Sequence, residues 1–408
     1  MKKIAMSIVT SSMLFAGGDI PPVEVSEPAQ AEFWGQIGFA YQFQDENHKI
    51  DGDFGDKENN AFSTTIVLGV QKELGNGFGL TAEVSGWSDF GLDIANNPRV
   101  DSSDATSAEI TQAYLSYATD NFAVKAGRQA LPASISPWAW TDTTAGVADW
   151  TYDGVTVANT DLADTTLVAA WISATSRDSS ERAVISDDAG LFMLAAINKS
   201  FSDTVISLNG YYIPESELNI LTGYTTQIAD TWSVWGSVVT KTGDIDLGIQ
   251  GAFVDGDVDG WDSTYGVAIK AGTSWGDLYT ELRAGYINDG DYRLAMAGAG
   301  TGVEDSSFWT DIYDISGDTY GAEQWSIQAR VKYSLQNGSS LYGAIGYWDF
   351  DDHPKWGDED NAWTMHAGYK FKIFDTNAKL EYRYRNFEYY HSADRERQRV
   401  RIEAYYKF

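Results

Sequence analysis

Charged residues near the end of the chain alternate with apolar ones, in a spacing that can build an electric field along a water-filled passage. Side chains at alternate positions of a β-strand share one face. Leu380, Tyr382 and Tyr384 would take one face of their strand, and charged residues would take the other. We predict an inward charged face in this part of the chain, made by Lys379, Glu381, Arg383, Arg385, Arg399, Arg401, Glu403 and Lys407. Such residues would select ions by field and width.

Two other segments add basic residues at positions that would also face inward. In the stretch 325–333 the odd positions are mostly apolar, so Gln328, Arg330 and Lys332 would face inward. His366, Lys370 and Lys372 would occupy a third inward face. Two interpretations remain open: the charges could form a basic ladder that sets a transverse field, or they could simply be solvated.

A loop at residues 129–150 is the candidate acidic partner of this ladder. It follows the stretch Val124–Gln129 and is rich in proline and tryptophan. If the loop folds into the passage, Asp142 and Asp149 would lie at the narrow point, with Asp153 nearby. The alternative is an external loop that never enters the passage.

Acidic loops could also bind hard cations such as Ca²⁺ or Mg²⁺, which prefer oxygen ligands. Asp255, Asp257 and Asp259 are spaced like the start of a calcium loop, but the twelfth position is Gly266 rather than Glu. A solvated acidic turn is the alternative. No motif for a catalytic nucleophile accompanies the four His residues, so we predict that the chain is not an enzyme and needs no cofactor.

The elements that must position these residues are amphipathic strands. From Phe33 onward, stretches of about ten alternating residues are followed by a tight turn or by a long polar loop. Leu74-Gly75-Asn76-Gly77 is a strong hairpin turn, whereas 288–324 and 351–361 are long acidic segments that we expect on the surface. Alternating short and long connections are typical of a transmembrane antiparallel β-barrel with short periplasmic turns and long extracellular loops.

The direction of the strands limits their number. A closed antiparallel barrel with both ends in the periplasm needs an even number of strands. The segment 218–227 alternates poorly and follows Pro214, so we assign it to an extracellular loop. This leaves an all-β barrel over residues 33–408 with about 18 strands, and 16 as the second choice.

Both ends of the chain agree with export to an outer membrane. Lys2 and Lys3 precede an apolar stretch, which predicts a signal peptide over residues 1–16. Cleavage after residue 31 is the alternative, and residues 17–32 would otherwise form a periplasmic leader. The final strand ends on Phe408, an aromatic residue of the kind that the barrel-assembly machinery reads.

Composition excludes several classes of protein. The formal net charge of −31 argues against a nucleic-acid partner, because phosphate binding needs a cationic surface. The absence of cysteine excludes disulfides and thiolate catalysis. Aromatic residues make up 14% of the chain, a proportion that suits girdles at the two lipid interfaces.

The chain resembles Gram-negative outer-membrane porins of the Opr type, the OprD-like and campylobacter-type channels. The resemblance rests on Ala16–Asp19, Val124–Gln129, the inward arginines and Phe408. It implies an 18-stranded barrel, usually a homotrimer, in contact with lipid and lipopolysaccharide, that passes small hydrophilic solutes. The strong acidity departs from the carboxylate-uptake members and favours cation preference or unspecific flow. A structural or adhesive surface protein and a barrel hydrolase remain alternatives.

Overall fold

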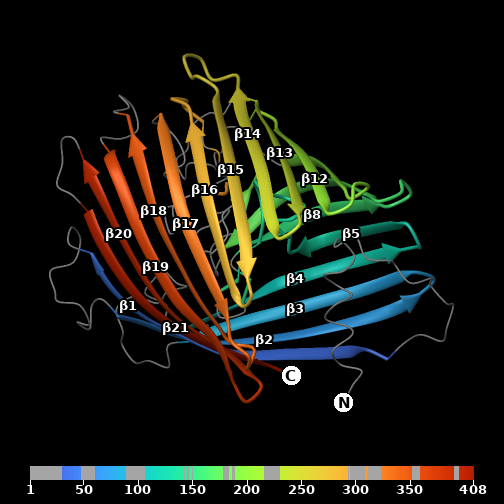
Figure 1. Ribbon diagram of the computed structural model, residues 1–408. Coiled ribbons are helices and arrows are strands. Elements are labelled where there is room, and N and C mark those ends of the chain that lie inside the picture. Colours follow the sequence, from blue (N-terminus) through green and yellow to red (C-terminus); the bar gives the residue numbers. More distant parts are fainter. Residues whose placement is uncertain are drawn as a thin grey trace.

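The structure is a computed structural model in which the strands form one closed barrel (Figure 1). It describes residues 30–46, 60–88, 106–141, 143–144, 147–148, 150–177, 183–185, 189–215, 230–292, 294, 308–310, 323–351, 359–389 and 395–408. The predicted signal peptide lies outside the described residues, as does nearly all of the predicted leader. No helix of a length and apolarity that could cross a membrane occurs in the described part.

The strands are long and mostly of similar length. In chain order they are β1 (Glu32–Glu46), β2 (Asn60–Gly75), β3 (Phe78–Ser88), β4 (Thr106–Ala118), β5 (Phe122–Gln129), β6 (Thr143–Thr144), β7 (Val147–Ala148), β8 (Trp150–Asn159), β9 (Thr165–Arg177), β10 (Ala183–Val184), β11 (Leu191–Asn198), β12 (Thr204–Ile213), β13 (Thr231–Thr242), β14 (Ile245–Gly256), β15 (Thr264–Trp275), β16 (Leu278–Ile287), β17 (Gln324–Ser334), β18 (Ser340–Phe350), β19 (Glu359–Ile373), β20 (Thr376–Tyr389) and β21 (Arg395–Lys407).

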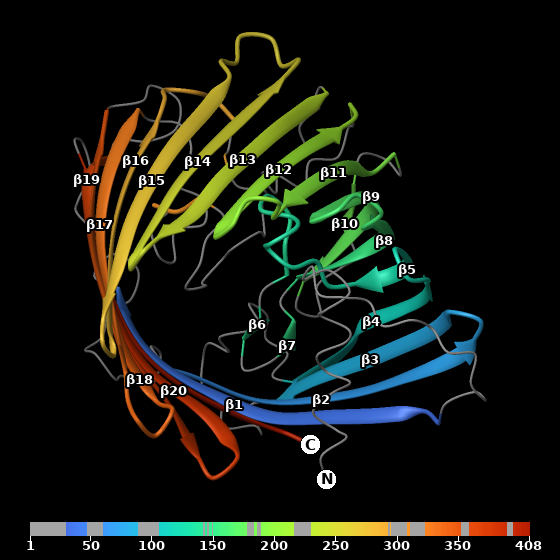
Figure 2. The ribbon, with the colours of Figure 1, turned by 45° about the vertical axis from the view of Figure 1, so that its right-hand side comes forward.

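The wall is an 18-stranded antiparallel barrel, as the alternation predicted. Each long strand pairs with its neighbours in chain order, and β1 pairs with β21 to close the ring. The short strand β10 adds to the edge of β9, while β6 and β7 form a separate hairpin that lies inside the ring in Figure 2. β12 pairs directly with β13, so the 18 strands of the wall are accounted for without the predicted loop segment 218–227, which lies outside the described residues.

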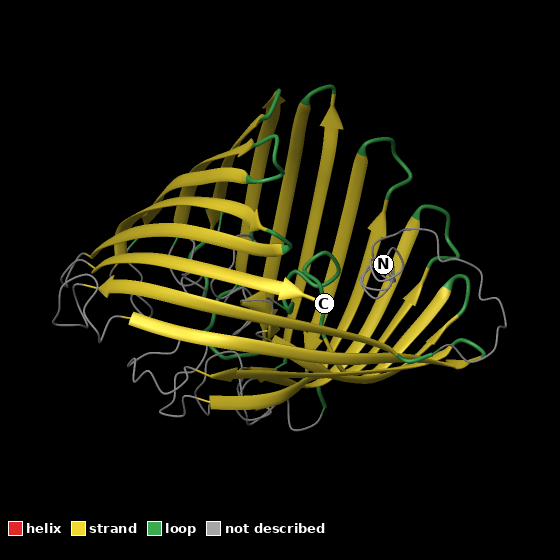
Figure 3. Cartoon of the chain, turned by 90° about the horizontal axis from the view of Figure 1, so that it is seen from below, coloured by secondary structure: helices red, strands yellow, loops and turns green. Residues whose placement is uncertain are grey.

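Short and long connections alternate around the ring, which gives the barrel a short-turn end and a long-loop end. The predicted turn at Asn76 and Gly77 joins β2 to β3, with φ of 53° and 81°. Positive φ at both central positions matches the twist of a tight hairpin. Asp164, Asp203 and Phe374 adopt positive φ in other short turns. Figure 3 shows how strands dominate the described structure.

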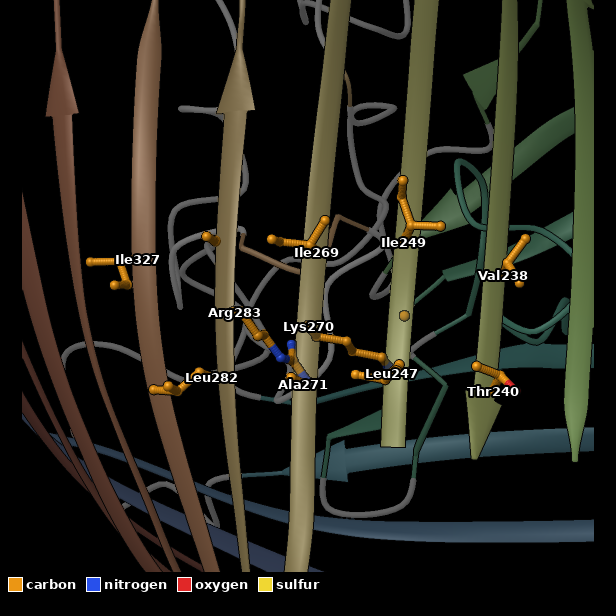
Figure 4. A pocket seen from close by; sticks show the side chains of 12 residues that line it. Val238, Thr240, Leu247, Ile249, Ile269, Lys270, Ala271, Leu282, Arg283 and Ile327 are labelled. Atoms are coloured by element: carbon orange, nitrogen blue, oxygen red, sulfur yellow. The ribbon is translucent and has the colours of Figure 1, made fainter. Parts of the chain in front are cut away.

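The outer face of the wall is apolar. Ile37, Leu194 and Leu282 are exposed on it, at 54%, 68% and 60% of their surface. Over β13–β17 this face contains a shallow groove of about 560 Å³ (Figure 4), in which the small residues Ala271 and Ala284 lie among larger aliphatic ones. Exposed aliphatic side chains at every second position suit contact with hydrocarbon.

The seam between β1 and β21 carries the last aromatic ring. Gly35 and Phe408 exchange two backbone hydrogen bonds of 2.9 Å. A Cβ atom on Gly35 would lie 2.4 Å from two carbons of the Phe408 ring, so the ring covers the glycine directly.

We therefore expect Gly35→Val to displace this ring and to lower the yield of folded barrel, because the ring covers the seam at which β1 and β21 close the wall. Heat-modifiable gel mobility after refolding measures the yield. Gly210→Val is the matched control, because nothing lies within 4 Å of a Cβ atom there. Equal yields for the two variants would contradict the expectation.

Candidate pore lining

One side of the inner wall is covered by an apolar segment of the connection between β5 and β8. Residues 131–141 form a loop that is closed by two hydrogen bonds, from Thr141 N to Leu131 O (2.7 Å) and from Leu131 N to Thr141 Oγ1 (3.0 Å). Within this loop Ile135 and Trp138 are buried, at 0% and 1% exposure. The third long connection therefore folds inward over its described residues.

The wall strands β8 and β12 hold this inward segment. The Trp138 ring packs against Tyr211 of β12, with ring centroids 5.3 Å apart. The Tyr211 hydroxyl accepts from Trp138 N and donates to Ser136 Oγ, both at 3.4 Å. Tyr152 of β8 donates to Trp140 O at 3.0 Å. The contacts join residues far apart in the sequence, so the segment is part of the barrel's core.

A second inward segment comes from the connection between β16 and β17. Trp309 N donates to Gln250 Oε1 (3.0 Å), and Arg283 Nη1 donates to Trp309 O (2.8 Å). Lys270 Nζ lies 4.2 Å from the Trp309 ring centroid. Phe308 is 3% exposed. The prediction that 288–324 is a surface loop is therefore wrong for residues 308–310. The apolar residues Phe308 and Trp309 within an acidic stretch were the available signal.

The opposite side of the inner wall, on β20 and β21, is charged. Arg401 Nε forms an ion pair with Glu403 Oε1 at 2.6 Å, and Lys379 Nζ lies 3.7 Å from Glu403 Oε2 and 3.6 Å from Glu381 Oε2. Arg383 also pairs with Glu381. These residues lie where the alternation placed them. Arg385 faces Arg397 across the two strands, and Arg397 was not among the residues predicted to face inward.

Glu381 is the centre of this charged surface, with an exposure of 1%. Besides Lys379 and Arg383, its carboxylate accepts a hydrogen bond from the Tyr342 hydroxyl (3.0 Å), and His366 Nε2 lies 3.1 Å from Oε2. Tyr342 was not recognised in the sequence. The available signal was weak. It was the glycine opposite Tyr342, Gly368, which leaves room for the tyrosine ring.

Strands β1–β5 continue the polar surface. Trp34 covers Gly69, whose Cβ position lies 2.0 Å from the indole ring, and its Nε1 donates to Glu83 Oε2 at 3.3 Å. Lys125 of β5 is 7% exposed and lies over the Tyr114 ring, 4.9 Å from its centroid.

The predicted lining residues outside β20 and β21 differ in exposure and in position along the barrel. Arg330 is half-buried on β17 opposite Glu281, and Lys332 is exposed near the short-turn end of that strand. Asp142 and Asp149 lie outside the described residues, so their position at a narrow point stays a prediction.

Asp153 does not face the lumen, contrary to its predicted place near the narrow point. Gln129 and Tyr152 are buried register partners on the inner face, so the next pair, Arg128 and Asp153, lies on the outer face. There Arg128 Nε donates to Asp153 Oδ1 at 2.7 Å, and Nη2 donates to Oδ2 at 3.2 Å. The bidentate ion pair occupies this carboxylate.

The predicted cation site is not formed either. Asp255 lies at the end of β14, where its Oδ1 accepts from Gly256 N at 2.9 Å. Asp257 and Asp259 follow in the loop, and the three carboxylates do not converge. Among the described residues no three His, Asp or Glu side chains are grouped to hold a metal ion.

The lumen therefore has two unlike sides. The inner face of β8–β16 is packed by the two inward segments into one hydrophobic cluster. The inner face of β19–β21 and β1–β3 carries charged and polar side chains. The polar side is the one that suits water and ions, because burying an ion in an apolar environment is costly.

No protein-family model matches the chain, and no curated protein matches its sequence. Solved structures do match. OpdO of Pseudomonas aeruginosa is 13% identical with a TM-score of 0.70, over 93% of this chain and 97% of that one. OpdK of P. aeruginosa, solved with vanillate, is 12% identical with a TM-score of 0.71, over 92% and 99% of the chains. OccK8 (OprE) of P. aeruginosa is 13% identical with a TM-score of 0.68, over 93% and 98%. The chain thus has the barrel fold of these proteins along nearly its whole length.

Proposed function

We propose that the chain is an outer-membrane porin, a passive diffusion channel for small hydrophilic solutes and ions. One observation carries the proposal: a closed wall is apolar outside and has a strip of charged side chains inside, on β20 and β21. An apolar exterior suits lipid, and a charged interior suits water and ions. The shared fold with OpdK, an outer-membrane protein, supports this proposal.

The inward segments are the proposed constriction. Residues 131–141 and 308–310 fill the apolar side of the lumen, so solutes would pass along the polar side. Asp142 and Asp149 belong to the same connection as the first segment and would bring negative charge opposite the basic ladder.

The same proposal predicts the orientation of the barrel, its surroundings and its oligomeric state. The short-turn end would face the periplasm, and Phe408 would be read by the assembly machinery. Lipid and lipopolysaccharide would surround the wall, and three copies would form a homotrimer. Ca²⁺ or Mg²⁺ would bind to acidic extracellular loops, which offer oxygen ligands. We propose transport without catalysis and without a cofactor.

Recording from refolded protein in a planar lipid bilayer tests this function. We expect stepwise ion currents, with a reversal potential under a salt gradient that reports ion preference. The refolded barrel must first show heat-modifiable gel mobility. A folded barrel that carries no current would contradict the proposal.

The filled side of the lumen favours one alternative, a structural or adhesive surface protein whose loops do the binding. A folded barrel with blocked conductance would support it. Hydrolysis of lipid or peptide substrates would instead support a barrel hydrolase.

A further inference from the structure

The charges on β20 and β21 are arranged in four levels along the barrel axis. Each level is one pair of residues that face each other across the two strands. From the short-turn end to the long-loop end the pairs are Lys379 with Glu403, Glu381 with Arg401, Arg383 with Arg399, and Arg385 with Arg397.

The two halves of this series differ in charge. In each of the two levels near the short-turn end, one basic residue faces one acidic residue, so the formal charges cancel. In each of the two levels near the long-loop end, both residues are arginines. The boundary lies at Glu381, whose carboxylate contacts Lys379 within the balanced half and Arg383 across the boundary.

Neighbouring strands reduce this difference without removing it, because Lys370 adds a basic residue beside Lys379 and Glu46 takes the register position beside Arg397. On β19, His366 faces Arg383, Thr364 faces Arg385 and Lys370 faces Lys379. On β1, Gln42, Gln44 and Glu46 take the register positions beside Arg401, Arg399 and Arg397. The level of Arg383 and Arg399 therefore has His366 and Gln44 at the neighbouring register positions.

We propose that Glu381 is a specificity-determining residue, which ends the cationic stretch of the channel halfway along its axis. This inference rests on the proposed channel function. Anions that enter from the long-loop end would concentrate at the arginine levels and meet a balanced section beyond them. Because fixed charge would then differ between the two halves, the current should depend on the direction of the voltage.

Glu381→Gln keeps the shape of the side chain and removes its charge. The cationic stretch would then extend from Arg385 to Lys379. A unit charge at 4 Å changes an ion's energy by about 1 kcal/mol in water, which is about fivefold in local concentration. Because anions gain and cations lose by this factor, we expect the anion-to-cation permeability ratio to rise by up to about 25-fold, and we expect a weaker dependence of the current on voltage direction.

Planar-bilayer recording of the full-length chain under a KCl gradient tests the inference. Glu281→Gln is the matched control, because Glu281 is also a buried inner-wall carboxylate, 2.6 Å from Arg283, but lies on the side packed by Trp309. Equal shifts for the two variants, or none for Glu381→Gln, would overturn the role of Glu381.

Glu403→Gln is the second variant, to be used if Glu381→Gln fails to fold. Its carboxylate belongs to the same balanced half and is more exposed, at 11% of the side chain against 0% for Glu381. We expect a shift toward anions for this variant too. Folded wild-type protein without any current would instead refute the channel itself, so the two failures are distinguishable.

Discussion

Replacing Trp138 with alanine should open the lumen and raise single-channel conductance. Trp138 is 1% exposed and packs against Tyr211 inside the barrel. Removing a buried tryptophan side chain costs about 3–5 kcal/mol. A loop of residues 131–141 is held by few backbone bonds, so a loss of this size should release it from the wall. We expect larger and noisier current steps in a planar bilayer.

Trp232→Ala is the matched control for this substitution. Trp232 is 41% exposed on the outer face of β13, where its ring packs against Phe253 with centroids 4.9 Å apart. The same change of residue there leaves the lumen untouched, so we expect wild-type conductance. A Trp138→Ala channel with the conductance of Trp232→Ala would show that residues 131–141 do not narrow the path.

The wall could be predicted from the sequence because its rule is local. A strand between lipid and water repeats with a period of two residues, so Ile402 and Arg401 reveal their faces without any knowledge of distant parts. The same rule places Asp153 and Tyr152 on opposite faces of β8. Asp153 was predicted near the narrow point because it follows the loop, and that prediction ignored the alternation.

The inward segments could not be predicted in the same way, because their burial depends on contacts between distant residues. Trp138 contacts Tyr211, and Trp309 contacts Gln250, only because the folded barrel brings these distant residues together. For the loop at residues 129–150 an inward position was one of the two interpretations that the sequence left open. In the connection after β16 the acidic residues outnumber the aromatic ones, and they concealed the same property at residues 308–310.

The central role of Glu381 also depended on register, which alternation alone does not determine. Alternation placed Glu381 and Arg383 on one face, but the four levels follow from which residue of β21 faces which residue of β20. Arg397 was missed because its strand begins within a polar stretch that has no apolar partner positions to reveal the period.

Replacing Arg383 and Arg399 together with glutamine should shift the channel toward cations more than any other pair of substitutions in the ladder. The two residues face each other at one level and are 6% and 7% exposed. Each removed charge changes the energy of a passing ion by about 1 kcal/mol at 4 Å in water, which is about fivefold in local concentration, downward for anions and upward for cations. Reversal potentials under a KCl gradient measure the shift.

The matched control removes two positive charges elsewhere in the lumen. Arg330 and Lys332 lie on β17, and Lys332 is exposed near the short-turn end. If the path follows the charged side near the long-loop end, Arg330→Gln with Lys332→Gln should shift selectivity less. Salt sharpens the comparison, because the screening length falls from about 10 Å at 0.1 M to about 3 Å at 1 M. The Arg383 and Arg399 effect should shrink at high salt yet stay the larger one, since ions passing at contact distance are screened least. Equal shifts for the two pairs at both salt concentrations would mean that the total charge of the lumen, and not the paired arginine level, sets ion preference.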